Sequence, residues 1–257
     1  MCNDSMIHHH HHHHHHFHNN HNQSSSIMKD NWNVQVIGKK VILVPYKEHF
    51  VPKYHSFMSD EKMLELTASE PLTLEEEYEM QKTWYNDPKK LTFIILSKED
   101  MSTDDEEKRS NHMTDKNERE VGCMAGDINL FLHDNDDPYN AEVDIMIGEP
   151  CYRNKGLATE ALNLIMHFGI HKLQIKRFFA KISETNEASI RLFERMGFER
   201  INYSEVWKEI EYEFVTNYND DEDDDCKRRN AQKNRDIVER NVDNAVWTTY
   251  DEVVGLN

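Results

Sequence analysis

The stretch at 141–169 limits what this chain can fold into more than any other part of the sequence. It opens with alternating apolar residues, Val143, Ile145 and Ile147, which is the pattern of a strand. A loop at 153–158 that contains arginine, lysine and glycine follows. Beyond it, apolar residues recur at the spacing of one helix face, at Leu157, Ala161, Leu164, Ile165 and Phe168. The stretch therefore predicts a strand, a short loop and a helix in succession.

The loop of this unit has the features of a phosphate-binding site. A helix that begins in a glycine-containing loop presents unpaired main-chain N–H groups and the positive end of its dipole, and these bind phosphate. Arg153 and Lys155 would add positive charge, and Gly156 has no Cβ to hold the ligand away from the backbone. We therefore expect a phosphate-containing ligand at this loop.

Two motifs resemble the GCN5-related N-acetyltransferases (GNAT). The loop Arg153–Ala158 fits the pattern Arg/Gln-x-x-Gly-x-Gly/Ala with which that family binds the pyrophosphate of acetyl-coenzyme A (acetyl-CoA). The segment Arg177–Arg200 resembles the strand and helix that follow in the family, with the ending Met-Gly-Phe. Three further segments, GKKVILVPY, LTASEPLTLEEEYEMQ and GDINLFL, resemble the N-acetyltransferase 9-like subfamily, close to the ribosomal-protein Nα-acetyltransferases. The resemblance covers roughly 33–215.

The resemblance implies the acyl-CoA N-acyltransferase fold, an α+β fold with a mixed, mostly antiparallel sheet of about seven strands and helices on both faces. The chain's own patterns predict strands at 34–46, 91–97, 121–132, 141–147, 177–182, 199–207 and 208–215. They predict helices at 50–66, 74–84, 157–169 and 187–196. Local signals are a break near Ser59–Asp60, a capping box at Thr73 and Glu76, a bulge at Gly126 and a C-cap at Gly197.

In this family the pantetheine arm of acetyl-CoA lies between two splayed strands, and the resemblance assigns acetyl-CoA as co-substrate. The cofactor-binding residues that it implies are Met146, Ile147, Gly148, Arg153, Asn154, Lys155, Gly156, Leu157, Ala158, Thr159, Asn186, Ser189 and Phe193.

Acetyl transfer by direct attack needs a neutral amine, and two acids are candidates for the general base. Glu142 and Asp144 share one face of a predicted strand, and either could act directly or through water. The alternative is that one of them only fixes the strand. An α-amino group, with a pKa of about 8, needs less help from a base than a lysine near about 10.4.

One family residue is missing from the expected site. Many members have a tyrosine in the last helix as general acid for the departing thiolate, and Phe193 stands at that position here. A thiol with a pKa of about 8.5 can leave without an acid, so the reaction does not require one. Cys151 lies beside the loop, and we interpret it as a small buried thiol rather than a nucleophile.

The function expected from the resemblance is N-acetyl transfer from acetyl-CoA to a primary amine. The leading candidate for that amine is the N-terminal α-amino group of a protein. The acceptor would be a protein or peptide. Two alternatives stay open, a small-amine acetyltransferase and a CoA-binding interaction protein with little catalysis. The sequence does not specify an oligomeric state.

Three segments lie outside the expected core. Residues 1–27 contain a histidine run at 8–16 and are predicted to be disordered, as an expression tag or a natural tract, with no specific metal site. The charged insertion 99–120 is predicted to be a long disordered loop within the GNAT domain at 33–215. Residues 216–257 are predicted to form an acidic, flexible tail.

Charge and composition exclude several classes of partner. The formal net charge of −18 would repel a nucleic-acid backbone. No apolar run is long enough to span a membrane, and no signal peptide is evident. The 4 cysteines form no CxxC pair, so the sequence predicts neither a zinc site nor a disulfide framework. A reducing, cytoplasmic location is therefore expected.

Overall fold

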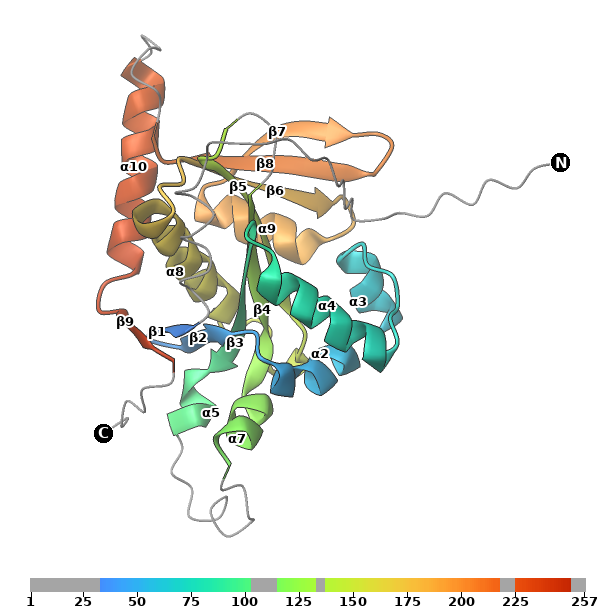
Figure 1. Ribbon diagram of the computed structural model, residues 1–257. Helices are drawn as coiled ribbons and strands as arrows, with labels where there is room; N and C mark the ends of the chain where they lie inside the picture. The colour runs from blue at the N-terminus through green and yellow to red at the C-terminus, as the bar shows by residue number, and fades with distance from the viewer. Residues whose placement is uncertain (1–32, 103–114, 133–136, 218–224, 251–257) are drawn as a thin grey trace, which may run out of the picture.

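The computed structural model describes residues 33–102, 115–132, 137–217 and 225–250. A 9-stranded sheet in the order β7-β8-β6-β5-β4-β3-β2-β1-β9 forms its centre (Figure 1). The strands are β1 (Val34–Ile37), β2 (Val41–Pro45), β3 (Lys90–Ser97), β4 (Met124–Leu132), β5 (Asn140–Ile147), β6 (Arg177–Ser183), β7 (Glu199–Ser204), β8 (Glu209–Val215) and β9 (Val246–Thr249). All neighbours pair antiparallel except β5 and β6, which are parallel. The expected mixed, mostly antiparallel sheet is confirmed.

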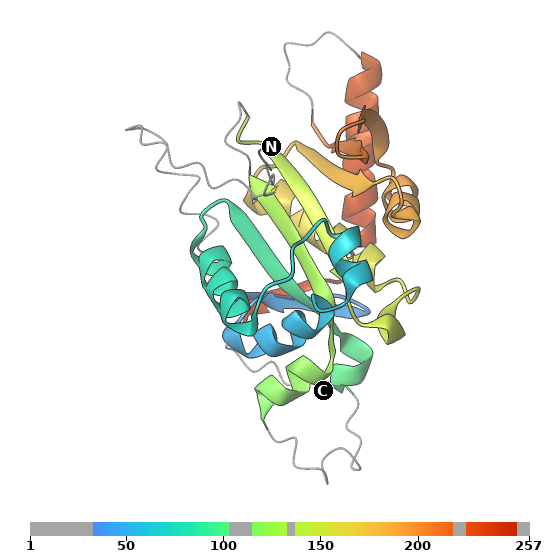
Figure 2. The ribbon, with the colours of Figure 1, turned by 90° about the vertical axis from the view of Figure 1, so that its right-hand side faces the viewer.

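Helices cover both faces of the sheet, as expected. On one face lie α8 (Leu157–Lys172), α9 (Glu187–Met196) and α10 (Asp225–Asn241), and the core beneath them includes Phe93, Phe168 and Phe178. On the other face lie α2 (Val51–Phe57), α3 (Glu61–Leu66) and α4 (Leu74–Asn86), which Figure 2 shows in front of the strands. The short helices η2 (Glu48–Phe50), η3 (Pro150–Tyr152), α5 (Lys98–Ser102) and α7 (Lys116–Gly122) complete the described part.

Several local predictions are confirmed at the level of single hydrogen bonds. The break in the first helix falls at Asp60, whose side chain caps α3 by accepting from the amides of Lys62 and Met63. Thr73 and Glu76 form the predicted capping box of α4. Gly197 ends α9 with φ of 92°, a left-handed conformation that favours glycine.

Gly126 lies beside the predicted bulge. In the ladder between β3 and β4, Ile95 pairs with Gly126 and Leu96 pairs with Met124, so Ala125 is the extra residue. A Cβ on Gly126 would lie 1.9 Å from the carbonyl oxygen of Met146. Only glycine therefore allows β5 to come this close to β4.

The first predicted strand is two strands. A turn at Gly38 separates β1 from β2, and the Gly38 amide donates to the carbonyl of Val41 at 2.9 Å. The sequence interpretation treated 34–46 as one strand because β-branched residues continue on both sides of the turn. This hairpin, together with β9, raises the sheet to 9 strands from the expected seven or so.

The interpretation of 216–257 as a flexible tail is wrong for its described part. Helix α10 packs on α8 and β8, and β9 pairs with β1 at the end of the sheet (Figure 1). The apolar signal was weak because α10 buries only two side chains, Ala231 and Val238, and because β9 joins the sheet through main-chain bonds.

The charged insertion also has more structure than expected. Helices α5 and α7 occupy its two ends, and Asp115 caps α7 by accepting from the amide of Asn117 with its side chain. Residues 103–114 and the histidine-rich segment 1–27 lie outside the described residues. Among the described helices, none has the length and apolar character needed to cross a membrane.

Candidate active site

Strands β5 and β6 lie side by side only at their first residues. Their ladder runs from the pair Asn140–Arg177 to the pair Glu142–Phe179. Beyond these pairs β5 continues against β4 and β6 continues against β8. The facing edges of the two strands therefore have main-chain groups without a strand partner. This is the splayed gap in which we expected the pantetheine arm.

The predicted phosphate loop follows β5 and the short helix η3 and leads into α8. Gly156 is the N-cap of α8 with φ of 83° and ψ of 11°, so the turn needs a residue that adopts the left-handed conformation. The Arg153 amide donates to the carbonyl of Pro150 at 3.2 Å. Within the described chain, none of the amides from Asn154 to Thr159 donates to another residue. These amides remain available to an anion at the positive end of the helix.

The side chains of the loop differ in what they can reach. Arg153, Asn154 and Lys155 are exposed, whereas Leu157 is 5% exposed and belongs to the core, so only its amide can serve a ligand. The Arg153 guanidinium donates to the carbonyls of Ile147 and Gly148, at 3.1 Å each. It thus bridges the loop and the end of β5.

Cys151 is exposed, so its interpretation as a buried thiol is wrong. It precedes Tyr152 in the one-turn helix η3, and it is Tyr152 that packs into the core. Neighbouring residues of this one-turn helix point to different sides, so the helix buries the Tyr152 ring and exposes the Cys151 thiol.

The predicted residues of α9 separate into a cap and a core residue. The Asn186 carboxamide oxygen accepts from the Ser189 amide at 3.1 Å and caps α9 where the chain leaves β6. The Asn186 amide nitrogen keeps its donor capacity. Phe193 is 2% exposed and packs edge-on against Phe198 at a centroid distance of 4.9 Å. Phe193 thus lies in the core, whereas Asn186 and Ser189 lie at the end of β6.

Glu142 and Asp144 lie on the face of β5 opposite α8. The Glu142 carboxylate is 3.4 Å from the Lys181 ammonium on β6. Asp144 is exposed and stands opposite Asn129 of β4. On the same face, β8 presents acids at alternate positions, Glu209, Glu211 and Glu213, because Ile210, Tyr212 and Phe214 face the core. This half of the sheet therefore offers an acidic surface beside the gap.

Asp127 is a functional candidate that the sequence analysis missed. It is 2% exposed on β4, pairs with Met146 in the ladder, and accepts from the Asn129 side chain at 2.8 Å. Burial, and then the nearby charge of Asp144, raise the pKa of Asp127 to about 7. The available signal was an acid at the start of an apolar strand, in the segment GDINLFL.

Other polar groups surround Asp127 on this face. Tyr46 and Tyr54 are buried, and burial raises the pKa of both hydroxyls, so they stay protonated at neutral pH. Lys90 is the first residue of β3, and burial lowers the pKa of its ammonium group. The face thus contains proton acceptors and donors within one sheet region.

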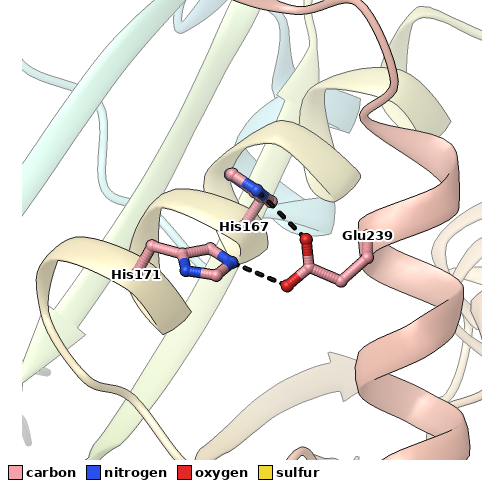
Figure 3. A group of neighbouring side chains, drawn as sticks. All are labelled: His167, His171 and Glu239. Carbon is pink, nitrogen blue, oxygen red and sulfur yellow. Dashed lines mark hydrogen bonds and ion pairs between the residues drawn. The ribbon is translucent and has the colours of Figure 1, made fainter.

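A second polar group connects α8 and α10, away from the gap (Figure 3). His171 Nε2 lies 2.7 Å from Glu239 Oε1, and His167 Nε2 lies 3.5 Å from Glu239 Oε2. Their ligand atoms are close enough for a metal ion. A metal on His167 Nε2 would place the hydrogen on Nδ1, which is buried and has no partner in the described structure. We therefore assign these side chains to the packing of α10.

The comparison with known families decides the classification. The family described as acetyltransferase (GNAT) domain matches residues 40–199. The chain belongs to the GNAT family. It is an acetyl-CoA-dependent acyltransferase with the family's fold, and acetyl-CoA is its co-substrate.

Relatives of this GNAT chain include an N-acetyltransferase 9-like protein from Nematostella vectensis, 46% identical over 190 residues, which cover 74% of this chain and 90% of the relative. An alpha/beta-tubulin-N-acetyltransferase 9 from Mus musculus is 45% identical over 183 residues, which cover 71% of each chain. The subfamily resemblance is thereby confirmed. Spermidine N-acetyltransferase from Vibrio cholerae, solved with CoA and spermine, superposes with a TM-score of 0.52 at 12% identity over 71% of this chain and 95% of its own.

Proposed function

We propose that this GNAT chain transfers the acetyl group of acetyl-CoA to the N-terminal α-amino group of a protein, by direct attack in a ternary complex. The observation that carries the proposal is the row of unpaired amides from Asn154 to Thr159 beside the splayed edge of β5. A diphosphate bound there directs the pantetheine arm into the gap. The thioester then lies next to the acidic face of the sheet.

The cofactor side of the site uses the loop and the strand end. The loop amides and the side chains of Arg153 and Lys155 bind the pyrophosphate, and the main chain from Met146 to Gly148 binds the pantetheine arm. The arriving phosphate takes over the Arg153 guanidinium from the carbonyls of Ile147 and Gly148. Those carbonyls then become available to the amides of pantetheine. Asn186 offers its side-chain nitrogen from across the gap.

The acceptor side uses carboxylates to take the proton from the amine. Asp144 is exposed on this face and its charge acts on Asp127, so we take Asp144 as the first of the two predicted bases. Asp127, on the same face of the adjacent strand β4, has a pKa of about 7, close to that of an α-amino group, and accepts the proton from Asp144 or a water molecule. The neutral amine attacks the thioester carbonyl carbon, the C–S bond breaks, and CoA leaves as the thiolate.

Two features favour a protein acceptor over a small amine. The relatives named alpha/beta-tubulin-N-acetyltransferase 9 are named for a protein acceptor. The turn between β7 and β8 exposes Val206 at 79% and Trp207 at 55% next to the acidic face, which gives a polypeptide an apolar contact surface. We place the reaction in the cytoplasm, where the thiols of Cys123, Cys151 and Cys226 would stay reduced.

The test is the release of free CoA thiol from acetyl-CoA with matched acceptors. We expect release with peptides that have a free N-terminus and none with the same peptides blocked at that end, even when they contain lysine. Release with spermidine but not with peptides would support the small-amine alternative, which the glutamates of β8 also suit. CoA binding without turnover on any amine would overturn the proposal in favour of an interaction protein.

A further inference from the structure

We propose that the β1–β2 hairpin is part of the acetyl-CoA site and that the Lys40 ammonium binds the cofactor's phosphate oxygens. The inference rests on the placement of acetyl-CoA at the 153–158 loop. Lys40 lies more than a hundred residues from that loop in the sequence, so no local motif connects the two.

The hairpin is fixed to the first turn of α8 by one side chain. The Glu160 carboxylate accepts from the amides of Lys39, Lys40 and Val41 at 2.7, 2.6 and 2.9 Å. A Cβ on Gly38 would lie 2.9 Å from the Glu160 carboxyl carbon, so this close contact depends on glycine. Charge-assisted hydrogen bonds of this kind are strong and directional, and they set the position of the turn relative to the loop.

The same contact brings the Lys40 side chain to the loop. Its Nζ donates to the carbonyl of Lys155 at 2.9 Å and lies 3.0 Å from the position that a Cβ on Gly156 would take. Gly156 is the residue whose missing Cβ allows a ligand to approach the backbone. A phosphate that binds the Gly156 amide therefore comes within reach of the Lys40 ammonium.

The charge balance around the loop supports an anionic ligand. Among the described residues, Lys40, Arg153 and Lys155 form no ion pair with a carboxylate. The Glu160 carboxylate accepts from the three hairpin amides and forms no ion pair with these cations in the described structure. Three cations around one loop without a carboxylate bound to them stand out in a chain whose formal net charge is −18. A di- or triphosphorylated ligand neutralises them.

The experiment measures CoA affinity by calorimetry on the full chain, without an acceptor. We expect Lys40→Ala to weaken binding about tenfold, which is the size of one charge-assisted hydrogen bond, and Lys40→Arg to retain most of the affinity. Lys39→Ala is the matched control. It removes a neighbouring lysine from the same turn and keeps the amide that Glu160 binds, so we expect affinity within about twofold of the parent.

Two further arms identify the phosphate and the role of Glu160. With 3′-dephospho-CoA, an unchanged effect of Lys40→Ala assigns the pyrophosphate, and a vanished effect assigns the 3′-phosphate. Glu160→Gln should weaken CoA binding in the parent chain but add little when Lys40 is already alanine, because it acts by positioning Lys40. Equal affinities of Lys40→Ala and Lys39→Ala, with melting temperatures unchanged, would refute the inference.

A comparison of two variants separates the role of Lys40 from the placement of CoA at the 153–158 loop. If Gly156→Glu abolishes CoA binding and Lys40→Ala leaves it intact, the loop holds the cofactor and the hairpin does not. If Gly156→Glu also binds CoA normally, the placement on which both ideas rest is wrong.

Discussion

Asp127 combines the features expected of a base at neutral pH, and its substitution is the most informative single change at the acceptor side. Its pKa of about 7 means that the carboxylate forms as the pH rises through neutrality. We expect Asp127→Asn to lower kcat by about 100-fold or more and to flatten the rise of kcat with pH around 7. Glu142→Gln, which removes the partner of Lys181, is the comparison and should leave the pH profile in place.

A stability measurement on the same variant separates chemistry from folding. The folded-state pKa of Asp127 is raised above its unfolded value of about 3.9, so the group stabilises the fold at low pH and this contribution is lost as the pH rises through 7. Asp127→Asn should therefore melt higher than the parent at pH 8. A variant that melts lower at pH 8 and shows proportionally reduced activity would mean that Asp127 is structural.

Substitutions of Gly156 test whether the 153–158 loop binds the diphosphate of CoA. We expect Gly156→Glu to weaken CoA binding by more than about 100-fold, because a carboxylate would face the diphosphate and the residue has φ of 83°. Gly156→Ala carries the backbone strain without the charge and should lose considerably less. Calorimetry with CoA measures both. Similar losses for the two variants would attribute the effect to strain instead of charge.

At the scale of elements, the sequence predicts those parts whose side chains follow a strong period. Helix α9 matches its expected range of 187–196, and it ends at the predicted C-cap Gly197, because a left-handed glycine is a local signal. The phosphate loop is a local signal as well, since Arg153, Lys155 and Gly156 lie within four residues of one another. These features need no information from the rest of the chain.

What the sequence could not predict depends on contacts between distant elements. Lys40 reaches the loop because the hairpin amides donate to Glu160, and main-chain donors and acceptors leave no trace in a residue pattern. The sequence does not reveal Asp127 because its pKa depends on burial and on the charge of Asp144, and both require the register of β4 and β5. The position of Phe193 in the core likewise depends on Phe198 in the next segment.

The contact between α8 and α10 predicts a loss of stability in acid. Burial, and then the charge of His171, lower the folded-state pKa of His167, although Glu239 opposes them and Arg235 lies 3.9 Å from that carboxylate. A lowered histidine pKa contributes stability above the unfolded value of about 6.5, and the contribution is lost as the pH falls through the folded-state pKa. We expect the melting temperature to fall between pH 7.5 and 5.5, and to fall less in His167→Gln. An equal fall in both proteins would exclude His167 as a cause.

At the scale of the whole molecule, the segment at 225–250 contributes side chains to the hydrophobic core and adds the outer strand β9 to the sheet. Val238 is fully buried against α8, and Tyr250 donates to Glu120 at 2.6 Å while its amide donates to the carbonyl of Asn33 at 2.7 Å. Strand β9 covers β1, which would otherwise be an exposed edge strand. The segment is thus bonded to the same hairpin that carries Lys40.

A chain that ends at residue 217 should therefore lose stability, and with it CoA affinity. Burial of Val238, Val242 and Tyr250 stabilises the fold by about 1.5–3 kcal/mol for each side chain, so we expect the melting temperature to fall by at least about 10 °C. Because β1 would lose its outer neighbour, the hairpin should hold Lys40 less firmly, and CoA should bind more weakly than in the full chain at a temperature where both are folded. Removal of residues 1–27 is the control, since a segment predicted to be disordered should change neither quantity. A chain ending at 217 with unchanged melting temperature would show that α10 and β9 are dispensable to the fold, and unchanged CoA affinity would show that β1 needs no support from β9.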